Sequence, residues 1–461
     1  MADESNSMLG WTTLAASFGF FLVQLDVTIV NVALPTIAGA LNAHVAGLQW
    51  VVDAYALTFA AILLTGGYIG DRFGARRTYL AGIVIFAMAS LACGLAADAA
   101  MLIAARVLQG IGAAAMLPCS LTLINHAAEG HPRRRAQAIG WWTAAGSISI
   151  AAGPVVGGLL LGLAGWRSIF FVSLPICLVG AWLTLRVEET ERLPATRGFD
   201  LLGQVLGIVA LAAVTAAVIE AKPLGFTYGL VPALAVIGIA AAVAFIWQES
   251  RAPQPMLPLA LFRSPAFSGA VAYGAIVNLT YYGAVFVLSL YLQRVLNYSP
   301  VSAGLAFLPL TATFFVVNVY SGWWAGRAGS LIPMATGAII DTCGFTLLGV
   351  LVTSATPYWQ LVVPFVLIPC GMGLGVPAMT TAVLASVPRE RSGTASAVLN
   401  AARQAAGAVG VAVFGALAGD DPGHIVAGLR GASLIAVIML LGAIGLAVLT
   451  IGRRQAQRSS A

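Results

Sequence analysis

Five ionisable side chains interrupt long apolar runs of the sequence and could carry proton or cation chemistry. They are three carboxylates, Asp26, Asp53 and Asp341, and two guanidinium groups, Arg106 and Arg403. A charged group inside a membrane-spanning segment is costly unless it is paired or faces a wet cavity, so each is a functional candidate. Burial favours the neutral acid, whereas a neighbouring arginine favours the carboxylate. Such a carboxylate could exchange a proton for a cation, which is the chemistry of antiport.

The runs that carry these residues have the length and composition of membrane-spanning helices. Hydrophobic residues make up 60% of the 461 residues and charged residues only 9%, and the mean hydropathy is +0.93. Soluble domains carry about a quarter charged residues, and a run of about 20 apolar residues crosses a bilayer as a helix. We therefore expect an all-α membrane protein with fourteen transmembrane helices, near residues 11–38, 47–69, 78–97, 101–124, 137–163, 168–186, 201–220, 227–247, 267–292, 301–325, 331–353, 359–384, 394–418 and 430–451.

The basic residues give the orientation of these spans. If both termini are cytoplasmic, 17 of the 23 Lys and Arg residues fall in the inner loops and the C-terminal tail, as the positive-inside rule requires. The net charge of +6 then reports topology, and we expect no nucleic-acid partner. The first eight residues lack the basic region of a cleavable signal, so the first run is expected to remain as a span. The Arg-, Ala- and Gly-rich composition indicates a bacterial source, so we expect a multi-pass protein of the bacterial cytoplasmic (inner) membrane.

Cysteine and histidine do not form a metal-binding or catalytic constellation. The five cysteines are isolated within apolar runs and are expected to be small buried residues, and the four histidines fall in the expected loops. No G-x-x-x-x-G-K-[ST] loop occurs, so ATP is not the direct energy source. We expect no metal and no cofactor, with protons as the coupling ion. Neither a membrane enzyme nor a channel gains positive support from the sequence.

One short pattern occurs twice. Gly67–Arg77 and Gly322–Gly329 both follow G-x-x-x-(D/G)-R-x-G, each at the inner end of the second span of a six-span block. With 51 glycines in the chain, chance is an alternative, but the matching position favours a duplicated unit, as in transporters built from two halves. The predicted domains are a six-helix bundle at residues 1–190, a two-helix insert with linkers at 191–264, and a second six-helix bundle at 265–461.

The first copy resembles the signature loop of the major facilitator superfamily, and other segments are similar to its fourteen-helix drug/proton antiporter branch. Leu25–Pro35 is similar to the first-helix motif of that branch, Arg106–Gly112 to its fourth-helix motif, and Gly153–Gly158 to the fifth-helix motif associated with antiporters. Further matches cover most of the chain: Trp166-Arg167, Phe199-Asp200 with Gly203, Leu290–Gln293, Ser299-Pro300, Ala303-Gly304 and Arg403-Gln404. The resemblance implies two pseudo-symmetric bundles that work by alternating access.

Two of these motifs would act on conformation. In the signature loop Gly67–Arg77, glycines allow a tight turn and Asp71 can accept charge-assisted hydrogen bonds. The resemblance therefore implies a latch that favours the outward-facing state. The alternative is an ordinary basic cytoplasmic turn. In the fifth-helix motif Gly153–Gly158, the kink at Pro154 and the small residues would form a pliable seam between helices. The alternative is ordinary close packing. The candidate latch comprises Gly67, Asp71, Arg72, Gly74, Arg76 and Arg77, and the candidate antiporter seam Gly153, Pro154, Gly157 and Gly158.

The resemblance also implies a central cavity lined by the first two spans. It would place Asp26 and Asp53 there, although an Asp near a helix end can be a cap, and Arg106 would tune Asp26. Asp341 falls on a span that supports the bundle from outside the cavity, so a second proton site and a structural pair both remain open. Arg403 is close enough to the inner surface to snorkel. The candidate cavity residues are Phe20, Asn31, Trp50, Tyr55, Gln109, Asn278, Tyr281, Tyr282, Phe286, Asn318 and Met372.

The function that these features predict is proton-coupled export of lipophilic, cationic drugs by an antiporter. The alternative within the same class is proton-linked transport of a specific metabolite or of an antibiotic made by the host itself. The expected partners are a small-molecule substrate and membrane lipid, and we expect a monomer.

Overall fold

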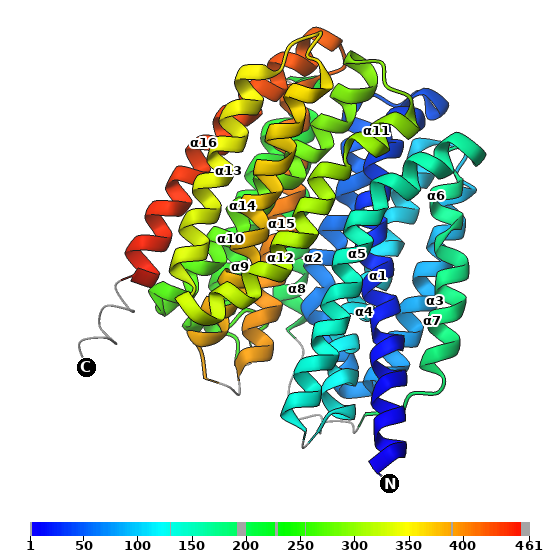
Figure 1. The fold of residues 1–461 in the computed structure, drawn as a ribbon, viewed down its shortest axis with the longest axis vertical. Coiled ribbons are helices and arrows are strands. Elements are labelled where there is room, and N and C mark those ends of the chain that lie inside the picture. The colour runs from blue at the N-terminus through cyan, green and yellow to red at the C-terminus, as the bar shows by residue number, and fades with distance from the viewer. Residues whose placement is uncertain are drawn as a thin grey trace.

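The structure, a computed structural model, describes residues 2–129, 131–190, 200–225, 229–253, 255–388 and 391–452, and these residues are almost entirely helical, with no strand among them (Figure 1). Thirteen of the described helical segments are long and apolar enough to cross a membrane, and the shorter apolar segment Ser168–Thr184 makes the fourteenth. The prediction of a fourteen-helix membrane protein is confirmed. Phe199, the start of the predicted insert at residue 191 and the basic tail after residue 452 lie outside the described residues.

The helices fall along the chain into three sets. The N-terminal group comprises α1 (Ala2–Leu41), α2 (Val45–Phe73), α3 (Ala75–Gly94), α4 (Ala99–Ala127), α5 (Pro132–Ala164), α6 (Ser168–Phe171) and α7 (Ser173–Thr184). The insert pair comprises α8 (Leu201–Leu224) and α9 (Leu230–Arg251). After the 3-10 turn η1 (Leu259–Arg263), the C-terminal group comprises α10 (Pro265–Leu290), α11 (Pro300–Ala306), α12 (Leu308–Ala328), α13 (Leu331–Leu351), α14 (Tyr358–Ala385), α15 (Ser392–Ala418) and α16 (Pro422–Ala447). A π-helical turn continues two of these helices: η2 (Tyr291–Val295) follows α10, and η4 (Val448–Gly452) follows α16.

Two of the expected spans are broken rather than continuous. The span expected at 168–186 divides at Val172, and the span expected at 301–325 divides at Phe307. Each break is followed at once by a proline in the first turn of the next helix, Pro175 or Pro309. Proline has no N–H to donate to the preceding turn and fits the first turn of a helix. The hydropathy of both segments is continuous, which is why they were expected to be single helices.

Helix ends and one cysteine also differ from the expectation. His126 lies in the last turn of α4 and His424 in the first turn of α16, rather than in loops. Cys343 on α13 is exposed, whereas Cys93, Cys119 and Cys177 are buried. Among the described residues no group of three or more His, Cys, Asp or Glu side chains could hold a metal ion.

Helix α8 of the insert pair lies against both groups of helices. Helix α8 packs on α9, on α2 of the N-terminal group and on α15 of the C-terminal group. Gln204 of α8 donates to Ala61 O at 2.8 Å and pairs with Thr65, both on α2. The domain boundaries at residues 190 and 264 stay predictions, but these bonds tie α8 to the N-terminal group near its inner end.

Large apolar side chains cover the outer faces of the helices. On α9, Val236, Ile239 and Val243 are each more than 60% exposed. A soluble protein rarely exposes a contiguous apolar surface of this kind, whereas lipid tails solvate it. The protein is therefore a multi-pass membrane protein.

Candidate substrate and proton site

Asp26 and Arg106 form a buried ion pair between α1 and α4. The Asp26 Oδ2 lies 2.5 Å from the Arg106 Nη1, and each side chain is only 1% exposed. The Arg106 Nε donates to the Val51 carbonyl oxygen of α2 at 3.0 Å, and the guanidinium lies 4.4 Å from the centre of the Tyr55 ring. Arg106 therefore neutralises Asp26 and links three helices at once.

Gln109 completes the hydrogen bonding of Asp26. One turn after Arg106 on α4, its Nε2 donates to the Asp26 Oδ1 at 3.3 Å and to the Ser90 Oγ of α3 at 2.8 Å. Its Oε1 accepts from the Arg106 Nη1 at 2.8 Å and from the Cys93 thiol at 3.2 Å. Both carboxylate oxygens of Asp26 thus have partners. Gln109 lies behind the ion pair and is a positioning residue rather than part of a cavity wall.

Asp53 has the opposite environment. It is 0% exposed, yet neither of its carboxylate oxygens has a hydrogen-bond partner. It lies more than two turns inside α2, which begins at Val45, so it is not a helix cap. Burying a carboxylate without a partner is costly unless it is protonated or binds a cation. Of the two carboxylates, Asp53 is the one that is free to take a proton or a cationic ligand.

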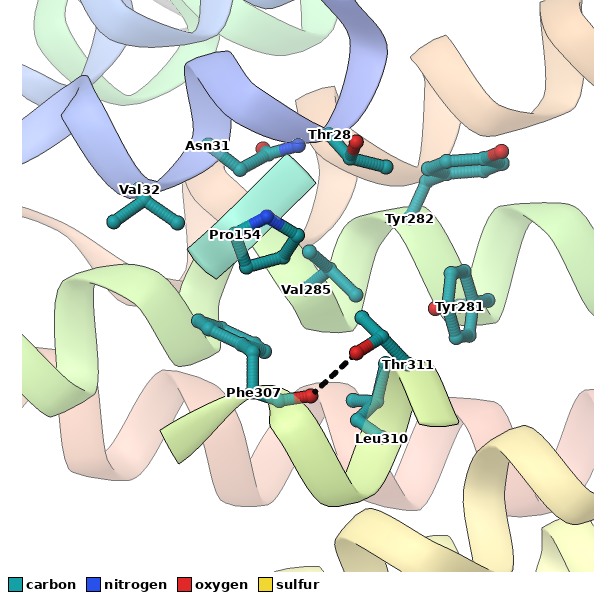
Figure 2. A pocket seen from close by; sticks show the side chains of 10 residues that line it. All are labelled: Thr28, Asn31, Val32, Pro154, Tyr281, Tyr282, Val285, Phe307, Leu310 and Thr311. Atoms are coloured by element: carbon teal, nitrogen blue, oxygen red, sulfur yellow. Dashed lines mark hydrogen bonds between the residues drawn. The ribbon is translucent and has the colours of Figure 1, made fainter. Parts of the chain in front are cut away.

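Two neighbouring cavities lie between the N-terminal and C-terminal groups. Cavity 1 is lined by Thr28, Asn31, Val32, Pro154, Tyr281, Tyr282, Val285, Phe307, Leu310 and Thr311 (Figure 2). Cavity 2 is lined by Val27, Val30, Asn31, Val52, Asp53, Tyr55, Ala56, Arg106, Tyr282, Gln404, Gly407, Ala408 and Val411. Asn31 and Tyr282 line both cavities.

The structure brings part of the predicted set to these cavities. Asp53, Arg106, Asn31, Tyr55 and the Tyr281–Tyr282 pair line one or both of them. Asp26 lines neither cavity itself but is bound to Arg106, which does.

The other predicted cavity residues lie away from both cavities. Phe20 stacks on Trp142 of α5 with ring centres 3.9 Å apart, and Trp50 donates from Nε1 to Glu220 of α8 at 3.0 Å. Both sit on faces of α1 and α2 that other helices cover. The remaining residues that line neither cavity are Gln109, Asn278, Phe286, Asn318 and Met372.

Sequence reasoning missed the contribution of α15. Gln404 lines cavity 2, together with Gly407 and Ala408 one turn further on. Gln404 was noted only as part of a motif with Arg403. Because glutamine is rare inside an apolar span, its presence there was a usable signal.

Asp341 and Arg403 lie outside the cavities. Asp341 of α13 is 1% exposed and its Oδ1 has no hydrogen-bond partner. Its backbone packs against Gly371 of α14, where an added Cβ would lie 2.6 Å from the Asp341 nitrogen. Arg403 lies beside Gly274 of α10; the residue is half-buried, and its Nε is buried without a hydrogen-bond partner.

The candidate latch loop is bonded to the segment that follows α7. Glu189 Oε1 accepts from the Arg76 backbone N–H at 2.9 Å, and Glu189 Oε2 lies 3.5 Å from the Arg77 Nε. Asp71 and Arg72 lie in the last turn of α2, which ends before Gly74 with φ 103°. The second copy of the pattern ends in the same way, with Gly329 at φ 74° after α12. Both glycines supply a left-handed conformation that disfavours other residues.

The candidate antiporter seam is a close contact between α5 and α11. A Cβ added at Gly304 of α11 would lie 2.4 Å from the Pro154 carbonyl oxygen and 3.2 Å from the Gly158 Cα. The other two glycines of the motif, Gly153 and Gly157, meet Thr28 and Ile29 of α1. The motif thus packs against both groups of helices.

Several hydrogen bonds join the two groups near their outer ends. The Gln49 Nε2 donates to the carbonyl oxygens of Val411 and Ala412 on α15, at 3.1 and 2.6 Å. Asp420 Oδ1, after α15, accepts from the Val45 backbone N–H at 3.0 Å and lies 3.7 Å from an Arg294 Nη1. We call these contacts the outer closure.

Comparison with known proteins agrees with this architecture. A sequence model described as the Major Facilitator Superfamily matches residues 16–411. The methylenomycin A resistance protein of Streptomyces coelicolor is 39% identical over 87% of this chain and 84% of its own length. The multidrug resistance protein Stp of Mycobacterium tuberculosis is 37% identical over 88% of this chain and 75% of its own length. The tetracenomycin C resistance and export protein of Streptomyces glaucescens is 34% identical over 90% of this chain and 77% of its own length. The fold is similar to a crystal structure of a POT family transporter, with a TM-score of 0.72, 13% identity and coverage of 93% of this chain and 94% of that one.

Proposed function

This chain belongs to the Major Facilitator Superfamily, and from that premise we propose that it is a proton-coupled exporter of lipophilic, cationic compounds. The observation that carries the proposal is the buried carboxylate of Asp53, which has no hydrogen-bond partner and lines a cavity between the two groups of helices. A site with a negative charge and apolar walls fits a lipophilic cation. The chain is a transporter, and no covalent step is needed.

The exchange cycle uses Asp53 as a shared site. In the inward-facing state a cation binds to its carboxylate, and rearrangement of the helices exposes the site to the outside. Release of the cation leaves a buried negative charge, which favours uptake of a proton. The neutral carrier returns, loses the proton to the cytoplasm and can bind the next cation. Asp26, already neutralised by Arg106, positions Arg106 at the wall of the cavity and does not compete for the cation.

The two conformational motifs would regulate this cycle. The α5–α11 contact at Pro154 and Gly304 would act as the seam at which the groups rock, since its small residues allow close sliding. The loop Gly67–Arg77 would act as an inner latch in the outward-facing state. We further propose that the protein works as a monomer in the bacterial cytoplasmic membrane, with a small molecule and lipid as its partners.

The names of the relatives support drug or antibiotic export. Two relatives are named for resistance to single antibiotics, methylenomycin A and tetracenomycin C, and another for multidrug resistance. The first two names keep open a second candidate, export of one specific antibiotic made by the host. A transport assay with several unrelated cations separates the two, because a specific exporter would move only one chemical type.

The test is transport of a lipophilic cationic dye into inside-out vesicles, with and without an imposed pH gradient. Uptake by vesicles that lack the protein is subtracted as passive accumulation. Gradient-driven uptake is expected for the wild type and is expected to be abolished in Asp53→Asn. Uptake that is independent of the gradient would show that transport is not coupled to protons. Full uptake by Asp53→Asn would show that Asp53 takes no part in the mechanism. Asp26→Asn and Asp341→Asn, assayed in parallel, report on the other two carboxylates.

A further inference from the structure

One residue that lines both cavities carries a buried hydrogen-bond acceptor with no donor. Asn31 of α1 is 4% exposed and lines both cavities. Its Nδ2 donates to the Val27 carbonyl oxygen at 2.8 Å, which fixes the orientation of the amide. Its Oδ1 is buried and has no hydrogen-bond partner. In Figure 2 the Asn31 side chain lies beside Thr28 at the α1 edge of cavity 1.

Asp53 adds two more acceptors on the cavity 2 side. Both of its carboxylate oxygens are buried without a partner. Two residues of the cavity 2 wall already use donors elsewhere: Arg106 binds Asp26 and Val51, and the Tyr55 hydroxyl donates to the carbonyl oxygen of Val23 at 3.4 Å. An unpaired buried acceptor is a costly feature that a bound donor would remove.

The two threonine hydroxyls of cavity 1 do not supply a free donor. The hydroxyls of Thr28 and Thr311 in cavity 1 donate to carbonyl oxygens of their own helices. Tyr282 and Gln404 carry groups that can donate or accept. The rest of cavity 1 is apolar and aromatic, including the rings of Tyr281 and Tyr282, whose centres lie 5.4 Å apart at an angle of 86°.

We propose that Asp53 and Asn31 together recognise a protonated amine that carries at least two N–H bonds, with the lipophilic part of the molecule in cavity 1. This inference rests on the proposed function and narrows its substrate class. The ammonium N–H groups donate to the Asp53 carboxylate and to the Asn31 Oδ1, so charge and hydrogen bonding are satisfied together. A quaternary ammonium supplies the charge but no N–H. A site built to bind an N–H group rejects an analogue that lacks it.

The test is equilibrium binding of a matched pair of dyes to the purified protein in detergent, followed by fluorescence polarisation. One dye carries a lipophilic secondary amine, which has two N–H bonds when protonated at the working pH, and the other is its N-methylated quaternary analogue, which has none. The wild type is expected to bind the amine at least about tenfold more tightly. Binding rather than transport is measured because weak bases accumulate passively across a pH gradient. The wild-type comparison requires no variant to fold.

Two variants assign the discrimination to Asn31. Asn31→Leu is expected to weaken binding of the amine dye and to leave binding of the quaternary dye unchanged. The ratio of the two affinities should therefore fall toward one. Asn278→Leu is the matched control: Asn278 is 2% exposed, donates to a carbonyl of its own helix at 2.8 Å and lines neither cavity, and it is expected to keep the ratio. Equal affinities in the wild type, or an equal loss of both in Asn31→Leu, would overturn the inference.

The two proposals fail in different ways. If both dyes bind equally and both lose affinity in Asp53→Asn, the cation site stands and only the N–H requirement is lost. If neither dye depends on Asp53, the proposed function fails together with the inference.

Discussion

The side chain of Gln49 on α2 reaches the backbone of α15, where its Nε2 donates a 2.6 Å hydrogen bond to the carbonyl oxygen of Ala412. The contact is possible because residue 415 is glycine; an added Cβ there would lie 2.6 Å from the same Nε2. Gln49 is 1% exposed and lies four residues before Asp53 on α2. The outer closure and the candidate coupling carboxylate are therefore one helical turn apart, so a movement that opens the closure would also expose the site.

Replacement of Gln49 by leucine is expected to favour the outward-open state. The variant loses two hydrogen bonds across the groups, at about 1 kcal/mol each, so the outward-open population should rise roughly tenfold or more. The measurement is the rate at which a membrane-impermeant maleimide labels a cysteine placed at Ala408, which is 1% exposed and lines cavity 2, in right-side-out vesicles. Gln360→Leu on α14 is the control and should leave the rate unchanged. A Gln49→Leu rate equal to that of the control would show that this contact does not close the outer side.

Removal of Arg106 is expected to destabilise the protein strongly. Arg106→Leu leaves the buried Asp26 without its ionic partner, which should cost about 3–5 kcal/mol. The double variant Asp26→Asn/Arg106→Leu removes the uncompensated charge and should recover most of this loss. The measurement is thermal unfolding in detergent of the wild type, of Asp26→Asn, of Arg106→Leu and of the double variant. Arg77→Leu, at a side chain that is 65% exposed, should have little effect. A double variant no more stable than Arg106→Leu would mean that the ion pair is not the source of the loss.

The helices and their orientation could be predicted because hydropathy and charge act locally. Each span is recognised from its own residues, and the arginines of the inner loops set the orientation of the whole chain. The breaks at Val172 and Phe307 were missed because a proline in the first turn changes the backbone without changing hydropathy.

The candidate site could be predicted only in part. Asp26, Asp53 and Arg106 stand out because ionisable residues are rare in spans, but the sequence does not show that Asp26 is paired and Asp53 is not. Whether Asp53 finds a partner depends on the rotation of α2 about its axis and on which side chains of neighbouring helices then face Asp53. Gln404 reaches cavity 2 from a helix about 350 residues further along the chain, and no local pattern encodes that contact.

A methyl group at Gly304 is expected to force α5 and α11 apart. In Gly304→Ala the new Cβ would lie 2.4 Å from the Pro154 carbonyl oxygen, a backbone atom that does not move away easily. Overpacking of this kind costs about 1–3 kcal/mol, so the melting temperature in detergent and the transport rate should both fall. Gly140→Ala on α5 has nothing within 4 Å of its new Cβ and should be neutral or slightly stabilising. Identical behaviour of the two variants would argue against a tight seam.

Loss of Glu189 is expected to loosen the candidate latch loop. Its carboxylate accepts from the Arg76 backbone N–H at 2.9 Å and lies 3.5 Å from the Arg77 Nε. A hydrogen bond to a charged group contributes about 1.5–3 kcal/mol, so Glu189→Ala should open the loop roughly tenfold more often. Trypsin cleavage after Arg76 and Arg77 in inside-out vesicles measures this, because cleavage follows the open population. Glu188→Ala alters the exposed neighbouring carboxylate and should leave cleavage unchanged; equal rates for both variants would remove Glu189 as the anchor.

Asp341 provides the sharpest contrast with Asp53, because both are buried carboxylates with an unpaired oxygen but only Asp53 lines a cavity. Asn has nearly the same shape and carries no charge, so Asp341→Asn should keep the close packing against Gly371 and leave the melting temperature equal or higher. Gradient-driven dye uptake should stay within about twofold of the wild type, whereas Asp53→Asn in the same vesicles should abolish it. If Asp341→Asn instead loses uptake while its melting temperature is unchanged, Asp341 is a second proton site. The coupling would then involve the C-terminal group of helices as well as the N-terminal one.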